Sequence, residues 1–149
     1  MPAVTRNTPK LTLEGAQIIL AAAQARAAEI KVPMDIAVVD DGGHLLAFAR
    51  MDGAKLSSVE IAIRKAHCAA IRRLPSGPSR SGDDVNVLLS LGLSVASQGR
   101  QIPLRGGIPL QVDGVCVGAI GVSNGSEDQD VDVAQAGGRA LNTALDTKS

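Results

Sequence analysis

Two apolar segments joined by a short acidic, glycine-containing turn constrain the fold of this chain more than any other feature. Residues 34–39 (MDIAVV) and 44–50 (HLLAFAR) flank Asp-Asp-Gly-Gly at residues 40–43. Apolar runs that flank an Asp-Gly type of turn are typical of a β-hairpin. Apolar residues occupy both alternating sets of positions in the two runs, so we expect a sheet that other elements cover on both faces.

Helices are predicted on either side of this hairpin. Residues 13–30 carry apolar side chains at helical spacing, Thr12 can cap the helix, and Pro33 ends it. A second helix is predicted to begin at Ser57, because Ser57 and Glu60 have the spacing of a capping box. Its apolar stripe is rich in alanine, which allows a close approach to a sheet or to a partner subunit.

The second half of the chain is predicted to contain four further segments. They are a mobile loop at residues 74–84, one or two short helices at 85–98, a second hairpin within 102–125, and a final helix from about Asp128 to Leu145. The second hairpin is predicted from Asp113-Gly114, which supplies its turn.

This order of elements predicts an α+β fold, in the form of a three-layer α/β/α sandwich with an antiparallel sheet. The pattern Gly-x-Gly-x-x-Gly is absent, so a dinucleotide-binding fold is not expected. With 149 residues, the chain is expected to form a single domain over residues 11–149, preceded by a flexible tail at residues 1–10.

Composition narrows the kinds of partner. The chain has 15 basic and 15 acidic residues, one phenylalanine, and neither tryptophan nor tyrosine, which argues against nucleic acid as a partner. The apolar runs are too short to span a bilayer, so no membrane partner is expected. The N-terminus lacks the pattern of a secretion signal, which predicts a cytoplasmic protein. Cys68 and Cys116 have no metal-ligand spacing, and no metal site is predicted.

An arginine and an aspartate follow the second apolar run in RMDGA. Arg50 and Asp52 are two positions apart, so in a continuing strand they would point the same way. Arg50 is a candidate to bind a substrate carboxylate, and Asp52 is a candidate to transfer a proton. The alternative is an internal Arg–Asp pair, or an aspartate that stabilises the turn.

Two glycine-containing segments hold further candidates for substrate binding. In IPLRGGIPL, Arg105 is a candidate carboxylate ligand, and the amides of Gly106 and Gly107 are candidates to hold an anionic oxygen. The alternative for the glycine pair is a tight start to the hairpin. In GAIGVSNG, Ser123 can hydrogen-bond a ligand, but the pattern is not that of a nucleophilic serine.

The helix predicted from Ser57 carries ionisable side chains within reach of a pocket. Lys65 and His67 are candidates for proton transfer. A solvated helix face is the alternative for both.

Four of these segments, in this order, resemble the GlcG/HbpS-like family, also called the haem-degrading domain family, which includes the C-terminal domain of PduO-type proteins. They are IAVVDDGGHLLAFARMDGA, the Lys-Ala pair of IRKAHCAA, the GGIP of IPLRGGIPL, and VGAIGVSNGSEDQDVDVAQAG. The resemblance implies a profilin-like sandwich, and homodimers that assemble into rings or octamers. It also implies a functionally mixed set, in which some members bind haem or iron, some are fused to corrinoid adenosyltransferases, and others belong to catabolic operons.

The chain differs from the usual family pattern at two places. His67 and Cys68 stand where relatives more often have Tyr or Phe followed by Thr, and Arg105 precedes the glycine pair where many relatives have Pro-Gly. Both differences add ionisable or reactive groups near the motifs.

The main functional hypothesis is a cofactor-independent catabolic enzyme, of the isomerase, hydratase or hydrolase type. It would act on a small carboxylate metabolite, at a pocket near a subunit interface. Arg50 and Arg105 would bind the carboxylate, while Asp52, Lys65 or His67 would transfer protons.

Two alternatives remain. The first is a haem- or corrinoid-binding or sensing module, so haem is a possible cofactor although none is required by the main hypothesis. Candidate axial ligands are His44, His67, Met51 and Cys68. The second is an accessory scaffold protein that only assembles into a homo-oligomer.

Overall fold

A four-stranded antiparallel sheet forms the middle of the molecule. In the computed structural model, which describes residues 1–147, the strands lie in the order β2-β1-β6-β5. The first hairpin consists of β1 (Asp35–Asp40) and β2 (Leu45–Arg50), and the second of β5 (Gly107–Val112) and β6 (Val115–Ser123). β1 pairs with β6, so the two hairpins predicted from sequence are confirmed and lie side by side.

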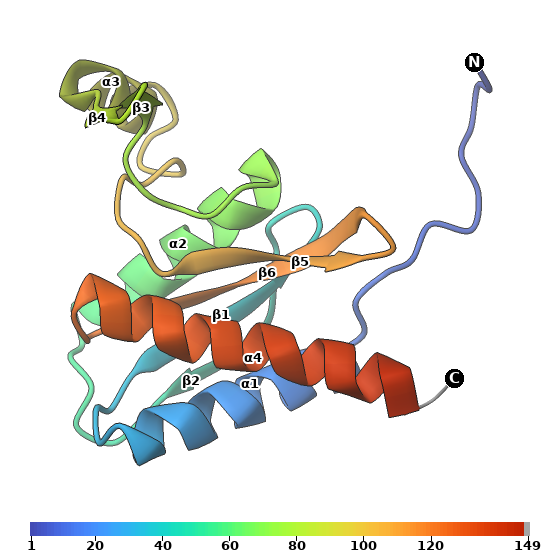
Figure 1. Ribbon diagram of the computed structural model, residues 1–149, viewed down its shortest axis with the longest axis horizontal. Coiled ribbons are helices and arrows are strands. Elements are labelled where there is room, and N and C mark those ends of the chain that lie inside the picture. The colour runs from blue at the N-terminus through green and yellow to red at the C-terminus, as the bar shows by residue number, and fades with distance from the viewer. Residues whose placement is uncertain (148–149) are drawn as a thin grey trace.

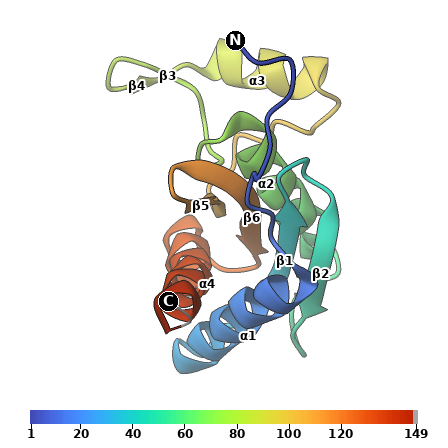
Figure 2. The ribbon, with the colours of Figure 1, turned by 90° about the vertical axis from the view of Figure 1, so that its right-hand side faces the viewer.

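Helices cover both faces of this sheet. α1 (Leu13–Glu29) and α4 (Glu127–Thr147) lie together on one face, and α2 (Ser58–Arg72) lies on the other (Figure 1, Figure 2). The α+β class and the three-layer α/β/α arrangement with an antiparallel sheet are therefore confirmed. Cover on both faces is complete for β1, whose side chains are buried from Asp35 to Val39, but not for β2, which is an edge strand of partly exposed residues.

The two faces of the sheet have cores of different character. The core between the sheet and α1 and α4 contains the larger side chains, among them Ile19, Ile36, Val38, Ile120, Val122 and Val133. The core under α2 is mostly alanine, namely Ala37, Ala62, Ala66, Ala69, Ala70 and Ala119, together with Val39. These small side chains let α2 lie so close to β6 that a Cβ at Gly121 would be 2.2 Å from the carbonyl oxygen of Ala62.

Two helix starts were predicted from capping patterns, with different outcomes. Thr12 accepts a hydrogen bond from the amide of Gly15 at 3.1 Å, which confirms the predicted cap of α1. The capping box predicted at Ser57 is wrong, because Ser57 has helical dihedral angles and makes no capping bond. A cap requires extended backbone, whereas here a turn already closes from Lys55 to Ser58.

The segment between α2 and β5 projects from the sandwich as an arm. It contains two short paired strands, β3 (Arg80–Ser81) and β4 (Asp84–Val85), followed by a single helix, α3 (Val87–Ala96). Both views show α3 standing apart from the sheet (Figure 1, Figure 2). The strand pair was not predicted in residues 74–84.

The N-terminal segment lies outside the helices and strands up to residue 12. Lys10 forms an ion pair of 2.6 Å with Asp41 in the β1–β2 turn. That residues 1–10 are flexible, and that residues 11–149 form one domain, stay predictions, and residues 148–149 lie outside the described part of the chain. None of the helices in residues 1–147 combines the length and the apolar character that a membrane span needs.

Candidate functional site

One end of the sheet gathers several of the predicted binding residues. β1 begins, β2 ends, β6 ends and β5 begins at this end, because Asp35 pairs in register with Arg50 on one side and with Ser123 on the other. Gly107 lies at the same end, opposite Gly121 of β6. The fold therefore brings Arg50, Ser123 and Gly107 to a common edge.

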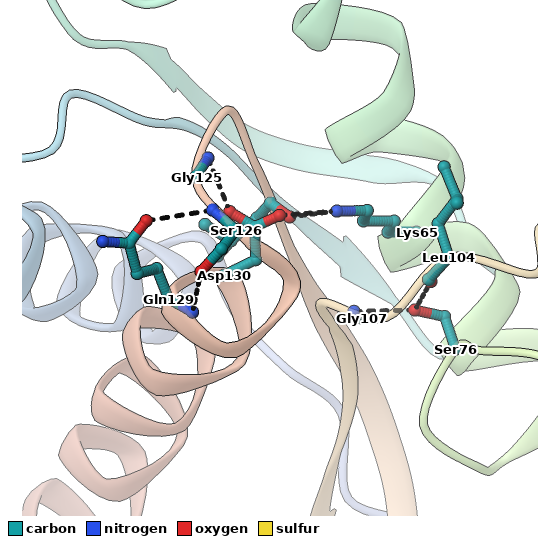
Figure 3. A network of polar contacts seen from close by, with 9 residues as sticks. Lys65, Ser76, Leu104, Gly107, Gly125, Ser126, Gln129 and Asp130 are labelled. Carbon is teal, nitrogen blue, oxygen red and sulfur yellow. Dashed lines mark hydrogen bonds and ion pairs between the residues drawn. The ribbon is translucent and has the colours of Figure 1, made fainter.

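A buried ion pair lies beside this edge (Figure 3). The Lys65 ammonium donates hydrogen bonds of 2.9 Å to Asp130 Oδ2 and to the carbonyl oxygen of Val122. The second carboxylate oxygen of Asp130 accepts from the amide of Gly125 at 2.9 Å. Burial raises the pKa of the Asp130 carboxyl, while the Lys65 ammonium and the Gly125 amide oppose that shift. These contacts fasten α2, β6 and the start of α4 to one another.

The glycine pair before β5 is occupied by contacts within the chain. The amide of Gly107 donates to Ser76 Oγ at 2.8 Å, and the carbonyl of Gly106 accepts from the amide of Val122 at 3.0 Å. A Cβ at Gly107 would lie 2.1 Å from the carbonyl oxygen of Lys65, so only glycine fits there. The arrangement favours the tight start of the hairpin over an oxyanion site at the Gly107 amide.

The remaining charged candidates near this edge are on the surface. Arg105 forms an exposed ion pair of 2.8 Å with Asp128. β2 ends at Arg50, and Asp52 lies beyond it in a turn. The expectation that the two side chains point the same way along one continuing strand is therefore wrong. Within residues 1–147, neither Arg50 nor Asp52 makes a side-chain hydrogen bond or ion pair.

His67 lies in a different place, on the outer side of α2. Its Nδ1 is 3.0 Å from the carbonyl oxygen of Gly43 in the β1–β2 turn. It lines an open groove of about 490 Å³ whose other lining residues are Val59, Glu60, Ile63, Arg64 and Arg100. The three predicted proton-transfer residues are thus not gathered within one chain, because Lys65 reaches α4, His67 reaches the β1–β2 turn, and Asp52 is in solvent.

The other candidate axial ligands have separate environments. Cys68 is fully buried, and Met51 packs against the core on the α1 side. His44 is exposed in the same turn that contacts His67. Among residues 1–147, no group of three or more His, Cys, Asp or Glu side chains is arranged to hold a metal ion.

Asp35 was missed at the sequence level. It is fully buried, and neither of its carboxylate oxygens has a hydrogen-bond partner among the described residues. Burial raises the pKa of the Asp35 carboxyl, and the charge of Arg50 opposes that shift. The available signal was an acidic residue at the start of the apolar run MDIAVV.

Comparison with known proteins gives consistent matches. A family model described as haem degrading protein HbpS-like matches residues 11–139. An uncharacterized 15.0 kDa protein from the dhaT-dhaS intergenic region of Citrobacter freundii is 39% identical over 121 residues, which cover 80% of this chain and 84% of that protein.

Two solved structures share the fold over nearly their whole length. The crystal structure of the Klebsiella pneumoniae protein ORFY has a TM-score of 0.84 and 30% identity, and covers 95% of this chain and 97% of its own. The crystal structure of a PduOC:heme complex has a TM-score of 0.80 and 32% identity, and covers 90% of this chain and 96% of its own.

Proposed function

This chain belongs to the HbpS-like family, and from that premise we propose that it binds haem through His67 in the groove on the outer side of α2. The observation that carries the proposal is the contact between His67 Nδ1 and the Gly43 carbonyl at 3.0 Å. A carbonyl oxygen only accepts, so Nδ1 donates this hydrogen bond, and in the neutral imidazole Nε2 is then the nitrogen with the free lone pair. Histidines that bind metals are commonly oriented by a contact of this kind.

The other residues of the groove suit the rest of a haem group. Val59 and Ile63 offer apolar surface to the porphyrin ring. Arg100 also lines the groove, and its guanidinium donates no hydrogen bond to any residue from 1 to 147. Arginine pairs well with carboxylates, such as the haem propionates. Bound haem would supply the redox chemistry of its iron, tuned by the axial ligand.

A haemin titration followed at the Soret band tests this proposal. The wild-type chain is expected to give a sharp, saturable band at one haem per chain or per subunit pair. His67→Ala is expected to lose it, and Arg100→Ala to weaken binding. His44→Ala is the matched control, since it removes the only other histidine of the chain. Equal spectra for the wild type and His67→Ala would overturn the assignment of the ligand.

A second candidate is the enzyme acting on a small carboxylate. Arg50 favours it, because its guanidinium is exposed beside a buried carboxylate and unpaired within residues 1–147. This candidate site has fewer residues than the sequence analysis proposed. Lys65, Arg105 and Gly107 are already engaged in hydrogen bonds or ion pairs within the chain. Calorimetric titration with propionate tests it, with loss of binding expected for Arg50→Ala. Absence of wild-type binding of propionate and of the hydroxy, amino and keto acids of the same length would exclude it.

Self-association is part of the proposal and is supported by the surface of α3. This helix carries Val87, Leu88, Leu91 and Val95, which are 55–84% exposed. Large exposed apolar patches mark interfaces in soluble proteins. Light scattering should give a dimer or a larger assembly such as an octamer, and Leu88→Glu should reduce its size. An oligomer that binds neither haem nor carboxylate would instead favour a scaffold.

A cytoplasmic location stays a prediction, tested by cell fractionation.

A further inference from the structure

The buried carboxylate of Asp35 has no role in the haem-binding proposal. It is 0% exposed, and both oxygens lack a hydrogen-bond partner within residues 1–147. A buried carboxylate normally has a charged partner or several hydrogen-bond donors, because the loss of water around an unpaired charge is not compensated. An acceptor that has been left open in this way is a feature that a ligand can use.

The neighbours of Asp35 are also unpaired. Cross-strand partners in an antiparallel sheet point to the same face, so Arg50 of β2 and Ser123 of β6 flank Asp35 on the α2 side. Ser123 is 6% exposed, and its hydroxyl makes no hydrogen bond with the described residues. Arg50 is the cross-strand partner of Asp35, and yet the two side chains form no ion pair.

The first two turns of α2 pack against the same face of the sheet, next to Ser123. Ala62 lies over Gly121, two residues before Ser123 on the same face of β6. Ser58, one helical turn earlier, is 8% exposed, and its hydroxyl likewise makes no hydrogen bond within residues 1–147. Asp35 of β1, Ser123 of β6 and Ser58 of α2 are therefore three buried polar side chains, and none of them has a hydrogen-bond partner among the described residues.

We propose that Asp35, Arg50 and Ser123 form a binding site for a small carboxylate that carries a hydrogen-bond donor, a hydroxyl or ammonium group, beside its carboxylate. The Arg50 guanidinium holds the ligand carboxylate, and Asp35 accepts from the neighbouring donor. The inference rests on the second candidate of the proposed function and adds to it the class of ligand. It replaces the exposed Asp52 with the buried Asp35 as the acidic group of that site.

The segment that leads from β2 to α2 lies at the same end of the sheet as this site, because β2 ends at Arg50 and α2 begins at Ser58. Residues 51–57 cross from β2 to α2, and the side chain of Asn124 accepts from the amide of Lys55 at 3.3 Å and donates to the carbonyl of Pro33 at 2.6 Å. Gly53 has a φ of +90° in this segment. Because Asp35 is fully buried, a ligand reaches it only if neighbouring residues move, and movement of this segment would break the bond between Lys55 and Asn124.

Calorimetric titration with four three-carbon acids tests the inference on the full chain. Lactate and free alanine carry a donor beside the carboxylate, pyruvate carries an acceptor there, and propionate carries neither. We expect lactate or alanine to bind about tenfold or more tightly than pyruvate and propionate, because a missing donor leaves the buried carboxylate unpaired. Which of the two binds identifies the donor as hydroxyl or ammonium.

Variants separate the inference from the candidate function on which it rests. Asp35→Asn should abolish the preference for the donor-bearing acid, while Asp52→Asn, which removes a nearby exposed charge, should keep it. Circular dichroism verifies that both variants fold. Equal binding of all four acids that is lost in Arg50→Ala would overturn the inference and leave the carboxylate candidate standing. Binding of none of the acids would reject both, and haem binding is independent of either result.

Discussion

Lys65 and Asp130 form an ion pair of 2.9 Å in which both side chains are 3% exposed, although they lie 65 residues apart in the chain. The glycine pair before β5 packs directly against it. A Cβ at Gly106 would lie 3.0 Å from Lys65 Nζ and 3.0 Å from Asp130 Cβ. The buried pair and the GGIP segment are therefore one structural unit, which joins α2, α4 and the second hairpin.

Breaking this pair from one side should be strongly destabilising. Lys65→Met leaves the Asp130 carboxylate buried with only the Gly125 amide as a partner. We expect a loss of about 3–5 kcal/mol in the free energy of unfolding, measured by urea denaturation. Arg105→Met is the control, because it breaks an exposed ion pair and should cost about 1 kcal/mol at most. Similar losses in the two variants would contradict a structural role for the buried pair.

Adding a methyl group at Gly107 should be as damaging as breaking the ion pair. In Gly107→Ala the new Cβ would meet the backbone carbonyl of Lys65, which cannot move without displacing α2. We expect a loss of about 3 kcal/mol or more in the thermal or urea unfolding free energy. Gly92→Ala is the matched control, because nothing lies within 4 Å of its Cβ in α3, and it should stabilise the helix by up to about 1 kcal/mol.

Removing the charge of Asp35 should stabilise the protein at neutral pH. Burial raises the pKa of this carboxyl, so the folded state holds the proton more tightly than the unfolded state does. Wild-type stability therefore falls as pH rises from the unfolded pKa of about 3.9 through the raised folded pKa. The advantage of Asp35→Asn should grow over that window and be largest at neutral pH, as followed by thermal unfolding. An effect of Asp35→Asn that does not change with pH would show that its charge is not the cause.

The ion pair at the N-terminal segment should appear in the titration of Asp41. The hydrogen bond from Lys10 lowers the pKa of the Asp41 carboxyl, so its contribution to stability is present above about pH 3.9 and is lost as pH falls through the folded pKa. In Lys10→Met, the Asp41 pKa measured by NMR should return toward its ordinary value. Lys31→Met, at an exposed lysine that forms no ion pair in residues 1–147, should leave it unchanged.

The hairpins and the first helix were predictable because their signals are local. Asp-Gly turns between apolar runs identified all four strands of the main sheet, and Thr12 identified the start of α1 within one residue. Apolar residues at both alternating sets of positions in β1 predicted that helices cover both faces of the sheet. These patterns report contacts between residues a few positions apart, which the chain itself keeps close.

Two segments have the same capping-box spacing, and only one of them forms the cap, so spacing alone does not predict a cap. Ser57 and Glu60 have that spacing but form no cap, whereas Ser126 and Gln129 exchange both reciprocal bonds at the start of α4, at 2.9 and 3.2 Å. The difference lies in the backbone that leads into each helix. Residues 51–57 enter α2 from the end of the sheet as a turn, and this geometry is imposed by the packing of α2 on β1 and β6.

The candidate sites depend on contacts between distant parts of the chain. Arg50 and Asp52 of RMDGA were predicted as site residues, but the acidic residue that lies next to Arg50 is Asp35, its partner across the β1–β2 strand pair. Lys65 is a reasonable proton-transfer group in isolation and becomes a buried structural cation once α4 supplies Asp130. Periodicity and turn chemistry determine which segments form strands and helices. The pairing and burial of each charge follow from how those elements pack, because desolvation and ion pairing act between residues that only folding brings together.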